Sequence, residues 1–576
     1  MPETTKLAQY LFKRLQQLGV GSIHGVPGDY NLTLLDYVEP SGLHWVGSCN
    51  ELNAGYAADG YAKVKGIGAL ITTFGVGELS AINAIAGAYT ERAALVHIVG
   101  TPARASQDAR LKIHHTFNDG NYRRFGQMAA HVTVAQISLR DPRLAPEQVD
   151  DILIQCLLHS RPVYIEVPVD LVDATVSSDR LESKLQIPKT LHTPGHDKAI
   201  AAVLEKIRAA KQPMIYVDGE ARALGILDEV STFIERTQWP TWTSSFARGL
   251  IDESLPNANG IYRGSYDSPE AQDFFKSADL VVVFGPHFSS TNSYAYTSIP
   301  RSEVTVSFTD TDISIGDQVY RDIPAKHALS LLLKQLDSSK VKTYDRAPEF
   351  PASTSAATFS SVSSDQTICQ DALWPLFGNF LQPGDLVFGE TGTASYGIRL
   401  LPLPKHARMF TSVTWLSIGY MLPATQGAAL AQKELVASGD YKGLKSGRAI
   451  LFIGDGSFQM TAQELSTIIR EKLDIMIFLI NNDGYTIERC IHGLKEGYND
   501  IAPWKYLQLS EAFGAENGTY TASAKTYGEL EKALSDEKLS NGKGLRMVEL
   551  FLEREDAPKG PLIGLMEKQK AAVNGA

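Results

Sequence analysis

The sequence is organised around short apolar runs that each end in a glycine-rich or polar turn. The clearest are "GALITTFGVG", "ALVHIVGTP", "PVYIEVPVD", "PMIYVDGE", "DLVVVFGP", "DLVFGETG", "AILFIGDG" and "IMIFLINNDG". Because these runs are apolar at both alternate sets of positions, they are typical of parallel strands that are buried on both faces. Helical stretches such as "VDDILIQCLLHS" and "TAQELSTIIREK" lie between them. The alternation predicts an α/β fold of doubly wound, mostly parallel sheets.

Two interruptions divide the chain into domains. With 576 residues, it is far too long to fold around a single hydrophobic core. Residues 177–196 are polar and weakly periodic, and residues 351–364 are rich in serine, alanine and threonine, as flexible connections are. We therefore expect three α/β domains, at residues 1–180, 195–345 and 360–550, and a C-terminal tail at residues 551–576.

Composition excludes several classes of protein. The formal net charge is -11 and the isoelectric point is near 5.7, so the chain lacks the basic surface that nucleic-acid binding requires. No apolar run reaches the roughly 18 residues of a membrane span. The four cysteines, Cys49, Cys156, Cys369 and Cys490, are scattered, which argues against a cysteine zinc site or a disulfide framework. We expect a cytoplasmic protein that binds neither nucleic acid nor membranes.

Polar residues follow two apolar runs in "AILFIGDGSFQM" and "IMIFLINNDGYTIE". Because neighbouring parallel strands end at one edge of a sheet, Asp455 and Asn482 are expected to meet there. Their side-chain oxygens and the backbone carbonyl of Gly484 suit Mg²⁺, which takes its other ligands from phosphates and water. Gly456 permits close approach of the backbone, and Ser457 offers a hydroxyl at a helix N-terminus.

Each of these triplets, taken alone, is better explained as an ordinary turn. Their pairing after two buried strands favours a metal-diphosphate site. A second feature, "LKIHHTFN", places His114 beside His115 and leaves three interpretations open: metal ligands, an acid/base pair or two unrelated loop residues. Metal binding is the weakest of them, because no third ligand is near in sequence and adjacent side chains rarely point the same way from regular backbone.

Eight motifs carry a family resemblance, in this order along the chain: "GVPGDYN", "CNELNAGYAADGYAK", "TTFGVGELSA", "HHTF", "ETGTASYG", "WLSIGY", "FIGDGSFQ" and "NNDGYTIE". Together they resemble the thiamine-diphosphate-dependent 2-oxoacid decarboxylases, most closely the fungal pyruvate decarboxylase branch, over nearly the whole chain. The resemblance implies a pyrimidine-binding domain, a middle domain and a diphosphate- and metal-binding domain, with thiamine diphosphate and Mg²⁺ as cofactors.

The reaction implied by the resemblance is the non-oxidative decarboxylation of a 2-oxoacid, pyruvate to acetaldehyde and CO₂, through an ylid and an enamine. One alternative is a preference for branched or aromatic 2-oxoacids such as phenylpyruvate and indolepyruvate. Another is a catalytically silent regulatory or assembly paralogue. Acetohydroxyacid synthase would require a flavin motif, and none is found between Thr190 and Asp345. A nucleotide-binding oxidoreductase is disfavoured because no G-x-G-x-x-G motif is complete.

The resemblance assigns catalytic roles to five residues. Glu51 would hydrogen-bond the aminopyrimidine ring of the cofactor, although alone it reads as an acidic residue in the first turn of a helix. Asp29, otherwise an N-cap, would steer His115, while His114 would approach the substrate from another angle. Glu488 would be buried at the thiazolium ring and handle protons around decarboxylation.

Further residues are implied for cofactor binding. Ile418 would hold the cofactor in a bent shape, and the backbone carbonyl of Leu416, where relatives often have glycine, would accept from its amino group. The cofactor-binding set implied by the resemblance is Glu51, Thr391, Thr393, Leu416, Ser417, Ile418, Asp455, Gly456, Ser457, Asn482, Gly484, Tyr485, Thr486 and Ile487. Within this set, Asp455, Asn482 and Gly484 would hold the metal.

The resemblance also implies an assembly, because cofactor and active site would lie between subunits. A homodimer is the minimum, and a homotetramer built as a dimer of dimers is the usual form. Two departures concern regulation and substrate. No cysteine lies between Cys156 and Cys369, so substrate activation would not use a thiol of the middle domain. Small residues near Thr291 in "HFSSTNSYAY" predict a widened substrate pocket.

Overall fold

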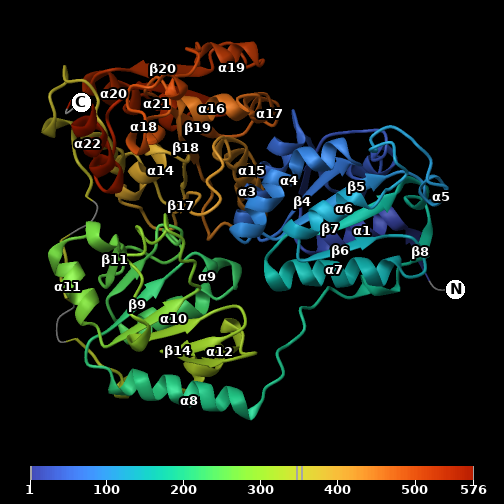
Figure 1. The fold of residues 1–576 in the computed structure, drawn as a ribbon, viewed down its shortest axis with the longest axis horizontal. Coiled ribbons are helices and arrows are strands. Elements are labelled where there is room, and N and C mark those ends of the chain that lie inside the picture. The colour runs from blue at the N-terminus through green and yellow to red at the C-terminus, as the bar shows by residue number, and fades with distance from the viewer. Residues whose placement is uncertain (1–2, 345–347, 352–354, 575–576) are drawn as a thin grey trace.

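The computed structural model describes residues 3–344, 348–351 and 355–574 (Figure 1). In these residues it contains two six-stranded sheets, one seven-stranded sheet and one two-stranded sheet. Residue 345 of the predicted middle domain and residues 352–354 of the predicted second connection lie outside the described residues. The predicted α/β fold with three mostly parallel sheets is confirmed. We call the parts of the chain that contain the three large sheets, in chain order, the first, middle and third domains.

The first domain is built on a six-stranded parallel sheet. Its strands, in spatial order, are β3 (His44–Gly47), β2 (Ser22–Gly25), β4 (Gly68–Thr73), β5 (Leu95–Thr101), β7 (Val163–Pro168) and β6 (Ala135–Ser138). Strands β4, β5 and β7 are buried on both faces, as their apolar runs predict. The covering helices are α1 (Leu7–Gln17) and α7 (Ala145–His159) on one face, and α3 (Glu51–Lys65) and α4 (Val76–Thr90) on the other.

The third domain repeats this strand order in another six-stranded parallel sheet. Its strands are β17 (Arg408–Phe410), β16 (Leu386–Gly389), β18 (Ala449–Gly454), β19 (Ile475–Asn481), β21 (Leu545–Phe551) and β20 (Tyr520–Ala524). In both sheets the connections change direction between the first and third strands in chain order. Ligands of doubly wound sheets bind at this switch point, beyond the carboxyl ends of the strands.

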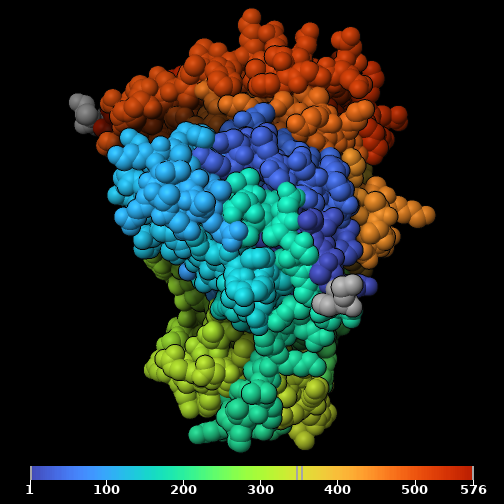
Figure 2. Space-filling model, turned by 90° about the vertical axis from the view of Figure 1, so that its right-hand side faces the viewer, coloured from blue at the N-terminus to red at the C-terminus, as the bar shows by residue number. Residues whose placement is uncertain are grey.

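The middle domain has a mixed sheet of seven strands. In spatial order they are β11 (Ala258–Ile261), β10 (Thr241–Thr243), β9 (Pro213–Val217), β12 (Leu280–Phe284), β13 (Thr305–Phe308), β14 (Ile313–Ile315) and β15 (Gln318–Tyr320). The first five are parallel, and the last two add antiparallel. One face carries α8 (Pro194–Ala209), α10 (Leu227–Thr237) and α12 (Ala325–Gln335). Figure 2 shows this domain projecting below the first domain, with the third domain above.

The chain ends differ from the sequence-based expectation. A short strand, β1 (Thr4–Lys6), precedes α1 and pairs antiparallel with β8 (Thr175–Ser177). The predicted C-terminal tail contains a helix, α22 (Pro561–Asn574), which packs on α18 (Thr486–Ile491) beside the predicted site. Among the described helices, none combines the length and apolar character needed to cross a bilayer.

Helix α15 (Met421–Ser438) of the third domain packs against α3 of the first domain (Figure 1). The two helices meet backbone to backbone. A Cβ atom at Gly427 would lie 1.8 Å from the carbonyl oxygen of Ala57, and one at Gly60 would lie 2.0 Å from that of Ala424. Only glycine fits these two positions. The contact is reinforced at the helix ends, where Lys65 Nζ lies 2.8 Å from Glu434 Oε2.

We predict that Gly427→Ala lowers the midpoint of thermal unfolding, because the added methyl group must push α3 and α15 apart. Overpacking of this kind costs about 1–3 kcal/mol. The control is Gly564→Ala in α22, where nothing lies within 4 Å of the added Cβ. Scanning calorimetry should show a lower midpoint for Gly427→Ala only. Equal midpoints for both variants would contradict the close approach of the two helices.

Candidate active site

A cavity lies beyond the carboxyl ends of β16, β18 and β19, at the switch point of the third sheet. Its free volume is about 430 Å³, part of it open to solvent. It is lined by the loops that follow these three strands and by Ile418, in the loop after β17. The residues predicted for cofactor binding that line it are Thr391, Thr393, Ile418, Asp455, Gly456, Ser457, Asn482, Gly484, Tyr485, Thr486 and Ile487. Residues that were predicted from the sequence, and that span nearly a hundred positions, therefore form most of the lining of one cavity.

Asp455 is the buried anion of this cavity. It is the first residue of α16 (Asp455–Thr461), directly after β18. The backbone N–H of Gly456 donates to Oδ1 at 2.8 Å, and that of Gly484 donates to Oδ2 at 3.2 Å. Burial nevertheless raises the pKa of Asp455 to about 6. A carboxylate that is this poorly solvated is stabilised by a nearby cation.

Asn482 completes an oxygen-rich corner beside Asp455. In one orientation of its amide, the nitrogen donates to Gly484 O at 3.0 Å and to Asp455 Oδ1 at 3.1 Å. In the other orientation the amide oxygen takes this place, and three oxygens converge. The amide nitrogen then faces Thr486 Oγ1 at 2.9 Å, and that hydroxyl donates onward to Arg554 O. Three converging oxygens suit Mg²⁺, so the donor set fits the predicted metal.

Two glycines in these loops allow other parts of the chain to pack closely against the backbone. Gly484 has φ of +128°, a conformation that side chains with a Cβ rarely adopt, and a Cβ there would lie 2.3 Å from Asn499 O. At Gly456 a Cβ would meet the ring of Tyr485 at 2.4 Å. The two glycines therefore leave room for the turn after β19 and for the tyrosine ring that lines the cavity.

A buried carboxyl group beside the cavity, Glu390, was not identified from the sequence. It follows β16 and accepts hydrogen bonds from the N–H groups of Thr391 at 2.7 Å and Met421 at 2.8 Å. Burial raises its pKa to about 7. Glu390 ties the start of α15 to the loop that carries Thr391 and Thr393. The "ETGT" motif contained the signal, but a glutamate at a strand end ordinarily indicates a solvated turn.

Glu488 lines the cavity from the first turn of α18, and in the single chain its side chain is exposed. No described residue of the chain covers it there. That Glu488 is buried beside a bound cofactor stays a prediction. The neighbouring Ile487 packs toward α22 and fixes the helix that carries the glutamate.

Asp29 and the two histidines form a second cluster, at the switch point of the first sheet. Asp29 follows β2, and the histidines lie in the loop after β5. The alternative N-cap interpretation of Asp29 is wrong, because α2 (Leu32–Leu35) begins three residues later with Asn31 as its N-cap. The ring of Tyr30 stacks on that of His114, with centroids 5.0 Å apart.

The pairing within this cluster differs from the prediction. Asp29 shares a hydrogen bond with His114, whereas His115 Nε2 lies 3.6 Å from Asp29 Oδ1, beyond a good hydrogen bond. His115 has φ of +60°, so its backbone is left-handed and both rings turn to the same side, with centroids 4.9 Å apart. Adjacent side chains point to opposite sides of a regular backbone, which disfavoured a metal site, but this does not hold at His115.

Asp29 is also a third ligating group beside the histidines, where only the resemblance, and no residue near in sequence, had placed one. One ligand atom from each of the three side chains lies within 4.8 Å of the others, so the cluster can hold a metal ion or pass protons. The hydrogen bond between Asp29 and His114 leaves the other ring nitrogen of His114 free, so the arrangement also suits a base.

Glu51 stands in the first turn of α3, as predicted. The helix is capped by Asn50, whose side chain accepts from the N–H of Asn53 at 2.8 Å. The Glu51 carboxylate lies over Gly77 at the start of α4, so that a Cβ there would be 2.9 Å from Oε1. None of the predicted catalytic residues of the first domain lines the third-domain cavity. We call these two separate groups of predicted residues, one in the first domain and one around the third-domain cavity, the half-sites.

Leu416 and Ser417 do not line the cavity either, although Ile418 does. Leu416 has φ of +54°, a left-handed backbone conformation that glycine adopts without strain. The loop before it is held by Glu91 of the first domain, whose carboxylate accepts from Ser412 Oγ at 2.7 Å and from Val413 N at 2.9 Å. Ser417 Oγ contacts the hydroxyl of Tyr56 in α3 at 2.7 Å.

The middle domain contributes no residue to the cavity. Its "VDGEARALG" stretch presents Glu220, which pairs with Arg92 Nε at 3.0 Å and with His287 Nδ1 at 3.1 Å. Thr291, the position predicted to widen the substrate pocket, is partly buried and is not among the lining residues. The segment nevertheless reaches the third domain, since Ser289 Oγ donates to Val413 O at 2.5 Å.

Three family models match the chain. The N-terminal TPP binding domain of thiamine pyrophosphate enzymes matches residues 5–122, their central domain matches residues 200–336, and their C-terminal TPP binding domain matches residues 390–550. The cavity lies within the third match, and the Asp29 cluster lies within the first. The family that the eight motifs indicated is therefore confirmed.

Two relatives with full-length similarity are pyruvate decarboxylases. A pyruvate decarboxylase of Aspergillus parasiticus is 56% identical and the match covers 99% of both chains. Pyruvate decarboxylase isozyme 1 of Saccharomyces cerevisiae is 37% identical, and the match covers 100% of both. A solved 4-hydroxybenzoylformate decarboxylase of Rhodococcus jostii, 18% identical, superposes with a TM-score of 0.74 over 95% of this chain and 99% of that one. This last likeness shows the shared fold.

We predict that Asp455→Asn weakens Mg²⁺-dependent binding of thiamine diphosphate by at least about tenfold, since losing even an outer partner of a metal ligand costs that much. Asp483→Asn is the control, because it removes the same charge from the neighbouring loop, after β19, at an exposed position. Fluorescence titration of the cofactor at several Mg²⁺ concentrations measures both. Equal affinities for the two variants would contradict the metal site.

Proposed function

The chain belongs to the thiamine pyrophosphate enzyme family, with fungal pyruvate decarboxylases among its relatives, and from this premise we propose that it converts pyruvate to acetaldehyde and CO₂. The observation that carries the proposal is the buried oxygen corner of Asp455, Asn482 and Gly484 at the switch point of the third sheet. Free cysteines at all four positions support a reducing compartment, the cytoplasm.

Each part of the cavity has a proposed task. Asp455, Asn482 and Gly484 would hold Mg²⁺, and the helix N-terminus at Ser457 would face the diphosphate. Ile418 would press against the cofactor from the opposite wall. When bound, thiamine diphosphate supplies a carbanion and an electron sink, while the protein orients it and excludes water.

Proton transfer is proposed for the groups around the mouth of the site. Glu51 would hold a proton at the pyrimidine ring. His114, oriented by Asp29, and the adjacent His115 would exchange protons with the substrate, because imidazoles do so near neutral pH. Glu488 would face them across the cavity mouth.

We propose that the site is completed by a second copy of the chain. The cavity is lined by third-domain residues, and the side chains of Asp29 and His114, 46% and 62% exposed, point to solvent in the single chain. A homodimer that brings the first domain of one copy to the third domain of the other would cover Glu488 and join the half-sites. A homotetramer would pair two such dimers.

Subunit complementation tests this arrangement. Chains with Glu51→Gln and chains with Asp455→Asn are each expected to be nearly inactive. Co-expressed in equal amounts, they should recover about a quarter of the wild-type activity, because half of the dimers are mixed and one of their two sites is intact. If each site were formed within one chain, no mixed assembly would contain a complete site, and activity would stay at the level of the single variants.

Replacement of either cluster histidine separates proton transfer from cofactor binding. His114→Phe and His115→Phe should each lower kcat by about 10²-fold or more, the usual contribution of general acid–base catalysis, with cofactor affinity little changed. His131→Phe, at an exposed position of the same domain, is the control. Weakened cofactor or metal binding with kcat retained would instead assign the histidines to metal binding.

Substrate range is tested with a panel of 2-oxoacids, thiamine diphosphate and Mg²⁺, with aldehyde release coupled to alcohol dehydrogenase. Pyruvate should be turned over readily, and the small residues around Thr291 predict measurable activity on phenylpyruvate and 2-oxoisovalerate. Negligible activity on these two acids would rule out the widened pocket. If no acid released aldehyde, the silent regulatory or assembly paralogue would be the better interpretation.

A further inference from the structure

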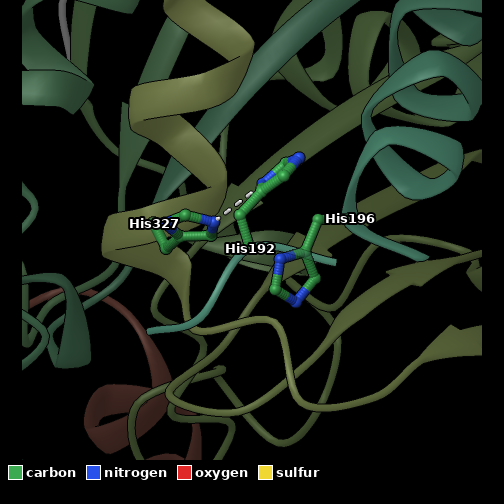
Figure 3. A group of neighbouring side chains, drawn as sticks. All are labelled: His192, His196 and His327. Atoms are coloured by element: carbon green, nitrogen blue, oxygen red, sulfur yellow. Dashed lines mark hydrogen bonds between the residues drawn. The ribbon is translucent and has the colours of Figure 1, made fainter. Parts of the chain in front are cut away.

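Three histidines gather where the connection from the first domain reaches the middle domain (Figure 3). His192 belongs to the connection, His196 to the first turn of α8 and His327 to α12. Figure 1 shows the connection as an extended segment that runs to α8. One ring nitrogen of each histidine lies within 4.8 Å of the others. The cluster is remote in sequence from every residue of the cavity described above.

The spacing of the ring nitrogens fits a shared metal ion better than a hydrogen bond. His192 Nδ1 and His327 Nε2 are 3.5 Å apart, which is long for a hydrogen bond. Two nitrogens bound at about 2.1 Å to a tetrahedral zinc ion lie about 3.4 Å apart. Figure 3 shows a nitrogen of each ring turned toward the same space.

The outer nitrogens of two rings already have acceptors. His192 Nε2 lies 3.0 Å from Asp197 Oδ2, and His196 Nε2 lies 3.2 Å from the carbonyl oxygen of Asp322. With the protons on these nitrogens, both Nδ1 atoms keep a lone pair. Metal-binding histidines are oriented in this way by carboxylates and backbone carbonyls.

Few strong interactions fix the positions of these imidazole rings within the chain. His196 Nδ1 accepts the N–H of Thr193 at 3.3 Å, a long contact that metal binding would replace. The connection itself makes few buried contacts, and Leu191 beside the cluster is 84% exposed.

We propose that His192, His196 and His327 bind a divalent transition-metal ion of the zinc class, which clamps the connection onto α8 and α12. Three imidazoles select such an ion over Mg²⁺, which prefers oxygen. A water would supply the fourth ligand, because Asp197 is occupied by His192 Nε2. The site is separate from the oxygen corner of the third domain, and the proposal does not depend on the proposed function.

Metal binding is tested on the full-length protein with Mg²⁺ and thiamine diphosphate kept present. After treatment with a chelator, titration with Co²⁺ should give visible absorption bands of a nitrogen-ligated ion, and Zn²⁺ should abolish them. His192→Gln and His327→Gln should weaken Zn²⁺ binding by at least about tenfold, and His131→Gln should bind as the unaltered protein does. Retention of Zn²⁺ in both triad variants, or its loss only in His114→Phe, would overturn the proposal.

The clamp is tested by proteolysis. Trypsin can cut after Lys184 and Lys189 in the exposed connection. Saturating Zn²⁺ should slow these cuts severalfold in the unaltered protein and in His131→Gln, but not in His192→Gln. Because His192 is exposed, this variant should fold normally. Cleavage that Zn²⁺ leaves unchanged in the unaltered protein would show that the ion does not hold the connection and would overturn the clamp.

Discussion

The contact between the backbones of α3 and α15 determines where both half-sites lie. Helix α3 begins at Glu51, and α15 begins three residues after Ile418, so one helix pair places a residue of each half-site. The helices approach so closely because Gly60 and Gly427 carry no side chain. Around this contact, Glu91 of the first domain holds the loop before Ile418, and Glu390 holds the first turn of α15. The geometry of the site therefore depends on contacts that touch no ligand.

Buried carboxyl groups dominate the electrostatics of the third domain. Asp455 and Glu390 follow neighbouring strands, and burial raises the pKa of each. They differ in their surroundings. Glu390 is enclosed and accepts from two N–H groups of the fold, whereas Asp455 faces the cavity beside the oxygens of Asn482 and Gly484. Only the second arrangement leaves anionic oxygen directed at an incoming cation, and this distinguishes a binding group from a structural one.

Local pattern predicted the strands and the cavity loops, because apolar runs and strand-end turns depend on neighbours in sequence. The features that it missed depend on contacts between residues far apart in the sequence or on local backbone conformation. The pairing of Asp29 with His114 follows from the left-handed backbone of His115, which no pattern indicates. The exposure of Glu488 depends on what a second chain would cover. The histidine triad combines His327 with residues more than a hundred positions away, and α22 lacks the strong amphipathic stripe that would identify it.

The shared strand order of the first and third sheets means that the chain contains two crevices of one design. In each, a helix begins between two glycines after the third strand in chain order, at Val76 in one and at Asp455 in the other. The neutral Val76 offers no ligand at this position of the first crevice, whereas Asp455 places a carboxylate there in the third. Two crevices of the same topology therefore differ in charge at equivalent places, and a single side chain is enough to make one of them attract a cation.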